Sequence, residues 1–415
     1  MKQKLFTRNF TLLVLGQAGS LFGNYILRLA LSMYVLEVTG SAAVFAAILS
    51  AAAVPMILLS PLGGILADRA DRRNVMVALD ALTGCAVLCA AFFLSREHAA
   101  LVTGVLLVVL SVFGAFETPT VQACIPQMLS GDAIIKGNAV VNQVASISFL
   151  TAPVLGGMFY AAFGLKPVMY ASVGCFFLTA FLECFIEPGG RTRAEHGNFG
   201  DMVKEDLLKS IQFLTKERPD IMKLLMLAAG ARFFVMGTIL VGFPYMIRTV
   251  LGLEAQYYGA AESMLAAAVI AGSIAAGALT ERLHSDRLSL VLAFMGICLL
   301  PAGAVFLLPV HTMAKYVVNV AAFCGLQAAI SIFSIFAVSM IQQNTPAHLI
   351  GKVMAYTSTV TMCAQPAGQM VYGFLFDGFR ENVWMVLLPT GAVVCAVGLW
   401  SGGFFRRMQG ERSSL

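Results

Sequence analysis

Apolar residues fill most of the chain in long runs, and polar residues gather in short stretches between these runs. A run of about 18 or more apolar residues is long enough to cross a bilayer as a helix. The runs predict twelve transmembrane helices over residues 10–36, 42–66, 75–94, 100–122, 138–163, 167–187, 221–249, 257–281, 288–309, 314–341, 352–376 and 383–405. The pattern therefore predicts an all-α polytopic membrane protein.

One long polar stretch, 188–220, falls midway along the chain. It divides the chain into an N-terminal six-helix bundle, 1–187, and a C-terminal six-helix bundle, 221–405, followed by a short tail, 406–415. Apolar residues at helical spacing within the stretch predict an amphipathic helix that lies on the membrane face. A docking site for a calmodulin-like partner is the alternative interpretation of this basic amphipathic segment.

The basic residues indicate the orientation of the chain. If both termini are cytoplasmic, 20 of the 27 Lys and Arg residues fall on the cytoplasmic side and five on the opposite side. The remaining two, Arg28 and Arg232, fall inside predicted spans. Cytoplasmic loops carry an excess of Lys and Arg, so we expect both termini in the cytoplasm.

Composition agrees with a membrane protein and excludes several other classes. The chain is 59% hydrophobic and 12% charged, whereas soluble domains are about 25% charged. All nine cysteines fall in or beside apolar runs and are interpreted as packing residues. Because most basic residues flank the spans, the net charge of +5 indicates no nucleic-acid partner. No nucleotide loop, zinc motif or metal cluster is apparent in the sequence, so we expect that the protein is not an enzyme and uses no cofactor or metal. We also expect it to be a monomer in the lipid bilayer.

The two halves repeat one another. A shift of 213 residues carries Gly64 and Asp68 onto Gly277 and Glu281, and the same shift carries Pro153 onto Pro366. One offset that aligns two separate motifs indicates a duplicated six-helix unit. Internal repeats of this kind place a substrate site near the bilayer midplane.

The loop at 63–73 carries five charges within six residues between two membrane-length runs. It resembles the loop between helices 2 and 3 of the major facilitator superfamily, through Gly64, Leu66, Asp68, Arg69, Arg72 and Arg73. The resemblance implies two pseudo-symmetric six-helix bundles, alternating access, and a conformational latch formed by this loop and by Glu281 in the second copy. Gly64 would let two helices approach closely, and the arginines would stay in water at the headgroups. An ordinary positive-inside loop is the alternative interpretation.

The fifth predicted helix carries Pro153, Gly156 and Gly157 in a pattern that resembles a motif of proton-driven exporters in the superfamily. Pro119, Pro126 and further residues up to 139 resemble the macrolide-efflux-like branch of these drug:proton antiporters. The resemblance implies proton-coupled efflux of amphipathic small molecules across the cytoplasmic membrane of a bacterium. An ordinary proline kink without any transport direction is the alternative. The arginine that such exporters often carry within helix 4 is missing here.

Two arginines inside the spans suggest a different cargo. A charge at mid-membrane costs several kcal/mol and therefore needs a reason. Arg28 and Arg232 occupy equivalent helices of the two halves and would suit an anion, such as a siderophore or a lysophospholipid. Arg28 could instead pair with an internal acid, and Arg232 could reach the headgroups. The candidate residues of the substrate cavity are Asn24, Arg28, Arg232, Gln327 and Ser331.

Asp80 and Glu117 are the candidates for proton coupling, because a buried carboxyl can carry a proton. Asp80 could instead pair with the arginines of the 69–73 loop, and Glu117 could lie at a solvated helix end. Glu183 is expected at the membrane interface, and Glu262 toward the outer end of its helix.

The latch interpretation makes one prediction. Asp68→Asn should remain folded in the membrane yet lose most turnover, because the amide cannot provide the charge that stabilises one conformational state. Abundance and initial transport rate, measured side by side, check this, and a wild-type rate in the variant would contradict it.

Overall fold

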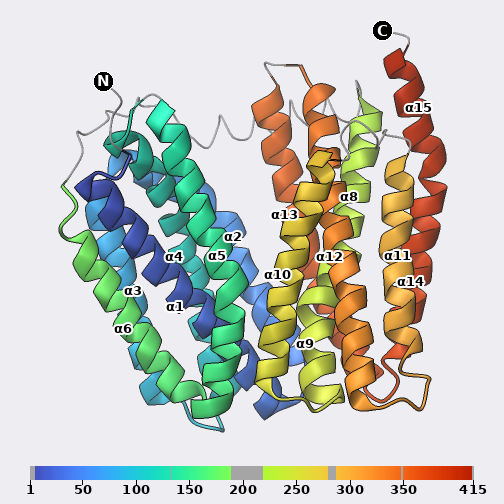
Figure 1. Cartoon of the computed structure of the whole chain (residues 1–415), viewed down its shortest axis with the longest axis horizontal. Helices are drawn as coiled ribbons and strands as arrows, with labels where there is room; N and C mark the ends of the chain where they lie inside the picture. Colours follow the sequence, from blue (N-terminus) through green and yellow to red (C-terminus); the bar gives the residue numbers. More distant parts are fainter. Residues whose placement is uncertain (1–4, 131, 188–217, 279–286, 347–348, 414–415) are drawn as a thin grey trace. The chain divides into compact units, whose positions relative to one another are not determined.

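The computed structural model describes residues 5–130, 132–187, 218–278, 287–346 and 349–413, and every regular element in these ranges is helical (Figure 1). The first six helices are α1 (Arg8–Thr39), α2 (Ala42–Arg69), α3 (Arg72–Phe93), α4 (Ala99–Met128), α5 (Asp132–Phe163) and α6 (Leu165–Glu183). The later ones are α8 (Pro219–Gly237), α9 (Phe243–Tyr245), α10 (Ala255–Ala278), α11 (Leu288–Ala304), α12 (Thr312–Gln343), α13 (Ile350–Gly378), α14 (Trp384–Trp400) and α15 (Gly402–Ser413).

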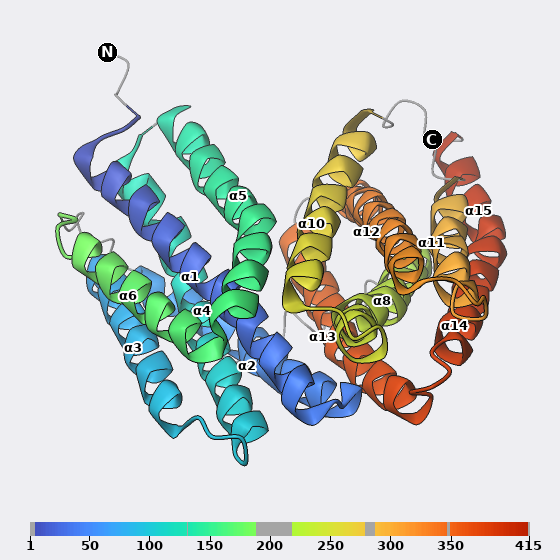
Figure 2. The same cartoon turned by 60° about the horizontal axis from the view of Figure 1, so that its bottom comes forward.

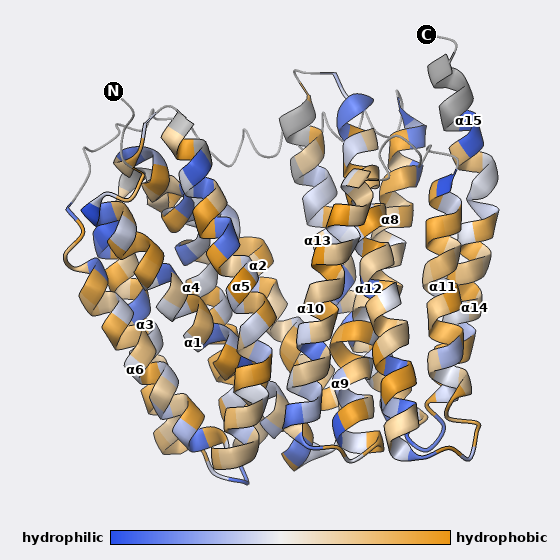
Figure 3. Ribbon diagram, viewed as in Figure 1, coloured by the Kyte–Doolittle hydropathy of each residue, from blue (hydrophilic) through white to orange (hydrophobic). Residues whose placement is uncertain are grey.

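These helices coincide with the predicted spans. Ten of the described helical stretches are long and apolar enough to cross a membrane, and α11 is a shorter apolar helix. Figure 3 shows apolar residues along the helix lengths, with many of the hydrophilic residues near the helix ends. The helix predicted over 288–309 ends earlier, at Ala304, and the expected tail begins inside α15. The amphipathic helix predicted within 188–220 lies almost wholly outside the described residues.

The helices group into two compact units, which broadly follow the predicted halves. The first contains the described residues of Met1–Gly40, Ile48–His196 and Leu253–Ser263, and the second contains those of Ser41–Ala47, Gly197–Gly252 and Met264–Leu415. The start of α2 therefore groups with C-terminal helices, and the start of α10 with N-terminal helices. Within the first unit α1 packs against α4, α5 and α6, and α3 packs against α4 and α6 (Figure 2).

A carboxylate explains why the start of α2 belongs to the second unit. The backbone amide of Ala42 donates to Oδ1 of Asp377 at 2.6 Å, and that of Ala43 donates to Oδ2 at 3.1 Å. Asp377 thus satisfies amide donors that a helix start leaves unpaired, and its negative charge suits the helix dipole. Close backbone packing accompanies this cap, because a Cβ on Gly373 would lie 2.4 Å from the Cβ of Ala46.

Glycines explain why the start of α10 belongs to the first unit. A Cβ on Gly157 would lie 2.7 Å from the carbonyl oxygen of Ala255, and a Cβ on Gly259 would lie 2.2 Å from that of Pro153. Only glycine permits this backbone approach. The start of α10 is therefore a packing partner of the α5 motif, and the contact lies at Gly259. Gly272, further along α10, faces the backbone of Ala328 in α12.

The predicted helix over 221–249 contains two widened turns. After α8 come a π-helical segment, η2 (Thr238–Gly242), the short α9, and a second π-helical segment, η3 (Met246–Val250). Pro244 lies between the two segments. Since proline has no amide hydrogen, the carbonyl one turn earlier loses its usual partner, and widened turns redistribute the hydrogen bonds.

The 63–73 region shows that Gly63, rather than Gly64, provides the close helix approach. A Cβ on Gly63 would lie 2.2 Å from the carbonyl oxygen of Ala115 in α4, whereas a Cβ on Gly64 would meet nothing within 4 Å. The sequence placed this role one residue too late, because a helix turns by about 100° per residue and neighbouring positions face different surroundings.

This difference supplies a prediction with a matched control. Gly63→Ala should lower the thermal unfolding midpoint of the purified protein in detergent, because α2 and α4 must separate to admit the methyl group. Overpacking of this kind costs about 1–3 kcal/mol. Gly64→Ala adds the same atom in open space and should leave the midpoint unchanged or slightly raised. Equal midpoints for the two variants would contradict the assignment.

Candidate functional site

A cluster of buried polar side chains lies inside the first unit, among α1, α3, α4 and α6. Its centre is Ser20 of α1, whose side-chain oxygen lies 2.9 Å from Oδ1 of Asp80 and 3.1 Å from Oε1 of Glu117. Asp80 is 3% exposed and Ser20 is 1% exposed, whereas Glu117 is partly accessible. The two acids proposed from the sequence for proton coupling are therefore brought together by one hydroxyl group.

The chemistry of this bridge requires a shared proton. A serine hydroxyl carries one hydrogen, so Ser20 can donate to only one of the two carboxyl groups at a time. For both short contacts to be hydrogen bonds, the other carboxyl must be protonated and donate to the serine oxygen. Two ionised carboxylates here would also repel one another strongly, because the surroundings are largely apolar. Asp80 and Glu117 together thus hold at least one proton in this arrangement.

A third acid belongs to the same cluster. Glu183, the last residue of α6, is fully buried, and its carboxyl group interacts electrostatically with those of Asp80 and Glu117. Neither of its carboxyl oxygens makes a hydrogen bond of normal geometry within the described part of the chain, although Asp80 lies beside it. We had expected Glu183 at the membrane interface, and this expectation was wrong. It is buried because α6 packs on a glycine face of α1, where a Cβ on Gly16 would lie 3.2 Å from Oε1 of Glu183.

Arg28 continues the polar face of α1 beyond Ser20. Its Nε donates to Oδ1 of Asn24 at 2.6 Å, and its Nη2 donates to the hydroxyl of Ser111 in α4 at 3.4 Å. Both partners are neutral. Pairing of Arg28 with an internal acid was the alternative interpretation, and no salt bridge of this kind occurs among the described residues. Glu117 nevertheless lies close enough to attract the guanidinium.

The arginines of the loop are partly buried rather than held in water. Arg72 donates to the carbonyl oxygens of Ala67 at 2.6 Å and Ala123 at 2.7 Å, and Arg73 donates to that of Ile186 at 3.4 Å. They join the ends of α2, α4 and α6. Asp80 accepts a hydrogen bond from Ser20, whereas the alternative interpretation paired it with the loop arginines. The side chains of Asp68 and Arg69, and the whole of Glu281, lie outside the described residues.

The remaining cavity candidates belong to the second unit. Arg232 of α8 has a buried Nε that makes no hydrogen bond within the described ranges. Ser331 of α12 donates to the carbonyl oxygen of Gln327, one turn earlier in the same helix, and Oε1 of Gln327 is buried without a hydrogen bond there. Nε of Arg232 and Oε1 of Gln327 thus lack a hydrogen-bond partner within the described residues, whereas the Ser331 hydroxyl is used by its own helix.

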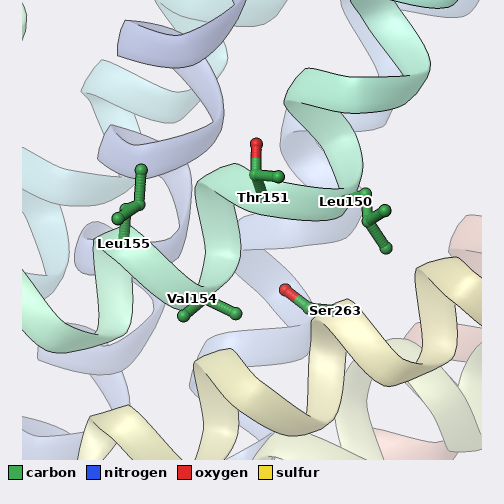
Figure 4. Close-up of a pocket in the computed structure, with 5 residues that line it drawn as sticks. All are labelled: Leu150, Thr151, Val154, Leu155 and Ser263. Atoms are coloured by element: carbon green, nitrogen blue, oxygen red, sulfur yellow. The ribbon is translucent and has the colours of Figure 1, made fainter.

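Gly156 and Gly157 face different neighbours. A Cβ on Gly156 would lie 3.3 Å from Cα of Ile26 in α1, while Gly157 faces the start of α10. The pair therefore fastens α5 to two helices at once. Beside it, a pocket of about 480 Å³ is lined by Leu150, Thr151, Val154, Leu155 and Ser263 (Figure 4).

The pocket is apolar except for two hydroxyls. That of Thr151 donates to the carbonyl oxygen of Ile147 at 2.7 Å, whereas the buried hydroxyl of Ser263 makes no hydrogen bond within the described chain. Such a lining suits an apolar group that carries a single polar atom. No predicted cavity residue lines it.

Sequence reasoning missed Ser20 and Glu183. A signal existed for Ser20, because it falls three residues after Gln17 and four before Asn24, on the polar face of the first predicted helix. Glu183 also carried a signal, as an acid near the end of the predicted span 167–187, but its burial depends on the glycine at position 16 of a different helix. Gln17, which is also buried, lies beside Glu117.

The family model described as Major Facilitator Superfamily matches residues 13–369. Macrolide efflux protein A of Streptococcus pyogenes is 24% identical over 391 residues, which cover 92% of this chain and 93% of the relative. The multidrug efflux pump Tap of Mycobacterium tuberculosis (strain ATCC 25618 / H37Rv) is 23% identical over 388 residues, which cover 90% and 88% of the two chains.

Two solved structures share the fold. The nucleoside transporter NupG aligns with a TM-score of 0.69 and 14% identity, covering 96% of this chain and 99% of that chain. A bacterial homologue of the iron transporter ferroportin, in an inward-facing state, aligns with a TM-score of 0.72 and 16% identity, covering 95% and 98%. At these identities the likeness extends to the fold alone.

The serine bridge makes a prediction that needs no substrate. Ser20→Ala should lower thermal stability more at mildly alkaline pH than at mildly acidic pH. The reason is that loss of the hydroxyl removes a hydrogen-bond donor from ionised carboxylates, whereas protonated carboxyls can bond to one another. Thr83→Val is the control, since the buried Thr83 hydroxyl bonds to the carbonyl of Leu79 in its own helix. A stability loss that is the same at both pH values in Ser20→Ala would contradict the shared proton.

Proposed function

As a member of the Major Facilitator Superfamily this chain is a multi-pass membrane transporter, and we propose that it expels amphipathic small molecules in exchange for protons. The observation that carries the proposal is the bridge of Asp80 and Glu117 by Ser20. An antiporter needs a group inside the bundle that takes up a proton in one state and releases it in another. A carboxyl pair that cannot be fully ionised has this property.

Glu117 is the member that exchanges protons with water, because it is the partly accessible acid of the cluster while Asp80 and Glu183 are buried. Thr118, the next residue of α4, is exposed. Asp80 is the inner acceptor, reached through Ser20. The helix 4 arginine of similar exporters is missing, but Arg28 reaches α4 from α1 at Ser111. Arg28 therefore provides a positive charge at α4 although that helix carries no arginine of its own.

Efflux of an amphipathic cargo is supported by the relatives and by the α5 motif. The relatives named above are called macrolide and multidrug efflux proteins. In this chain Pro153, Gly156 and Gly157 occur in the exporter-like order and hold α5 against two other helices. The basic residues favour cytoplasmic termini. The bacterial relatives support a bacterial cytoplasmic membrane as the location. In this proposal the 63–73 loop, with Asp68, is the conformational latch of alternating access.

The proposal predicts the behaviour of a Glu117 variant. Glu117→Gln should still bind a fluorescent amphipathic dye without a gradient, yet a pH gradient should no longer drive dye transport, because the amide cannot carry a proton. Everted vesicles from an efflux-deficient host, with and without an uncoupler, provide the measurement. Glu97→Gln, which changes an exposed acid outside the cluster, should transport like the wild type.

Two results would count against this assignment. If Glu117→Gln concentrates dye against its gradient like the wild type, Glu117 does not carry the coupling proton. If wild-type transport itself ignores the uncoupler, proton antiport is wrong.

An exporter or exchanger of organic anions is the second candidate. The observation in its favour is that Arg28 is held by the neutral side chains of Asn24 and Ser111, so its charge is free of a carboxylate ion pair within the described residues. Arg232 in the second unit has an unbonded Nε as well. Vesicles preloaded with an organic anion distinguish the two functions, because an exchanger accumulates labelled anion without a pH gradient, whereas the proton antiporter does not.

A further inference from the structure

An apolar layer lies directly beside the acid cluster, at the end of the bundle that we expect to face the cytoplasm. It consists of the buried residues Phe10, Leu13, Met76, Val121, Cys124, Ile125, Leu129 and Ile186, which we call the apolar plug. Further apolar side chains of α1, α4 and α5, which are partly buried, pack around it.

In α1, α3 and α4 a plug residue lies four positions away from a residue of the acid cluster. Leu13 precedes Gln17 by four residues in α1, and Met76 precedes Asp80 by four in α3. Val121 follows Glu117 by four residues in α4. Four residues correspond to roughly 6 Å along a helix axis, so the plug covers the cluster by about one turn. Ile186, three residues after Glu183 and just beyond the end of α6, completes the plug.

Glu183 is the acid that this layer isolates most completely. It is fully buried, and its oxygens make no hydrogen bond of normal geometry within the described ranges. The ionisable groups that face it are Asp80 from α3, Glu117 and Cys124 from α4, and Cys184 in the next position of the chain. The loop cations on the plug side donate to backbone carbonyls, Arg73 to that of Ile186 and Arg72 to those of Ala67 and Ala123. An ionised carboxylate without a donor or counter-ion is too costly in such surroundings, so Glu183 holds a proton in this state.

We propose that Glu183 is a third proton-exchanging site of the cluster, closed from the nearer end of the bundle by the apolar plug and reached only through Asp80 and Glu117. This inference rests on the proposed function, and it adds a store behind the carboxyl pair. A proton that enters at Glu117 passes to Ser20, which simultaneously releases its own hydroxyl proton to Asp80. Glu183 holds a proton at the start. When Glu117 has released its proton to water, Glu183 passes its own proton to Asp80 by the reverse of this route, and a proton that later arrives at Asp80 reloads it. Ser20 is unchanged at the end, and only protons have moved.

The first experiment reads the proton on Glu183 directly. Infrared difference spectra of the purified full-length protein, recorded on raising the pH, report protonated carboxyl groups. Wild type should lose absorption from more than one carboxyl, and Glu183→Gln should lack one of these components while retaining that of Glu117. Glu97→Gln should match the wild type. A Glu183→Gln difference spectrum identical to that of the wild type would overturn the proposal.

The second experiment tests the plug. Val121→Thr places a hydroxyl in the plug, in α4, with little change of shape. Val87→Thr makes the same change at a fully buried position of α3 that lies outside the plug. In proteoliposomes with an internal pH dye and no substrate, Val121→Thr should pass protons severalfold faster than the wild type, and Val87→Thr should not. Equal proton leaks in the two folded variants would overturn the assignment of the plug.

Failure of this inference and failure of the proposed function give different results. If wild-type efflux ignores an uncoupler while Glu183→Gln loses its carboxyl band, the antiport function is wrong and the third proton site stands. If efflux depends on the proton gradient while the band of Glu183→Gln is unchanged, the antiport function stands and the third site is wrong.

Discussion

The hydrocarbon interior provides no water to solvate a carboxylate, and the first unit nevertheless brings two carboxyl groups onto one serine, with a third carboxyl group close to them. This constraint determines what the cluster can do. Ser20 has a single hydroxyl hydrogen, so the carboxyl groups must supply the missing donor themselves by holding protons. Protonation is therefore a structural requirement of this arrangement. The same requirement makes the cluster responsive to any movement that lets water reach Glu117.

Close helix packing makes this cluster possible. Gly16 gives Glu183 room against α1, and Gly63 brings α2 onto α4 at Ala115. Without a hydrophobic effect between helices in lipid, such small-residue contacts supply much of the association energy through close packing. The glycines thus serve two purposes, since they hold the helices together and exclude space in which water could solvate the acids.

The short segments at the starts of α2 and α10 show two different ways of fastening a helix end. Asp377 caps α2 with charge-assisted hydrogen bonds, whereas α10 is held by backbone contacts at Gly157 and Gly259. A cap depends on an ionised carboxylate, and a glycine contact depends on shape alone. The repeated halves of the sequence have therefore diverged in chemistry at the ends of their helices, even where the shift of 213 residues still aligns them.

The sequence by itself determined the helices, the division into halves and the family, because apolar run length, a repeated offset and the 63–73 motif are all local along the chain. It also identified Asp80 and Glu117, since a charge within an apolar run is conspicuous. Only the tertiary structure decided that these two acids meet at Ser20, that Gly63 rather than Gly64 carries the close approach, and that Glu183 is buried. The physical reason is that burial and hydrogen-bond partners depend on which faces of separate helices meet. That depends on contacts such as Gly16 against Glu183, which lie more than 160 residues apart in the chain.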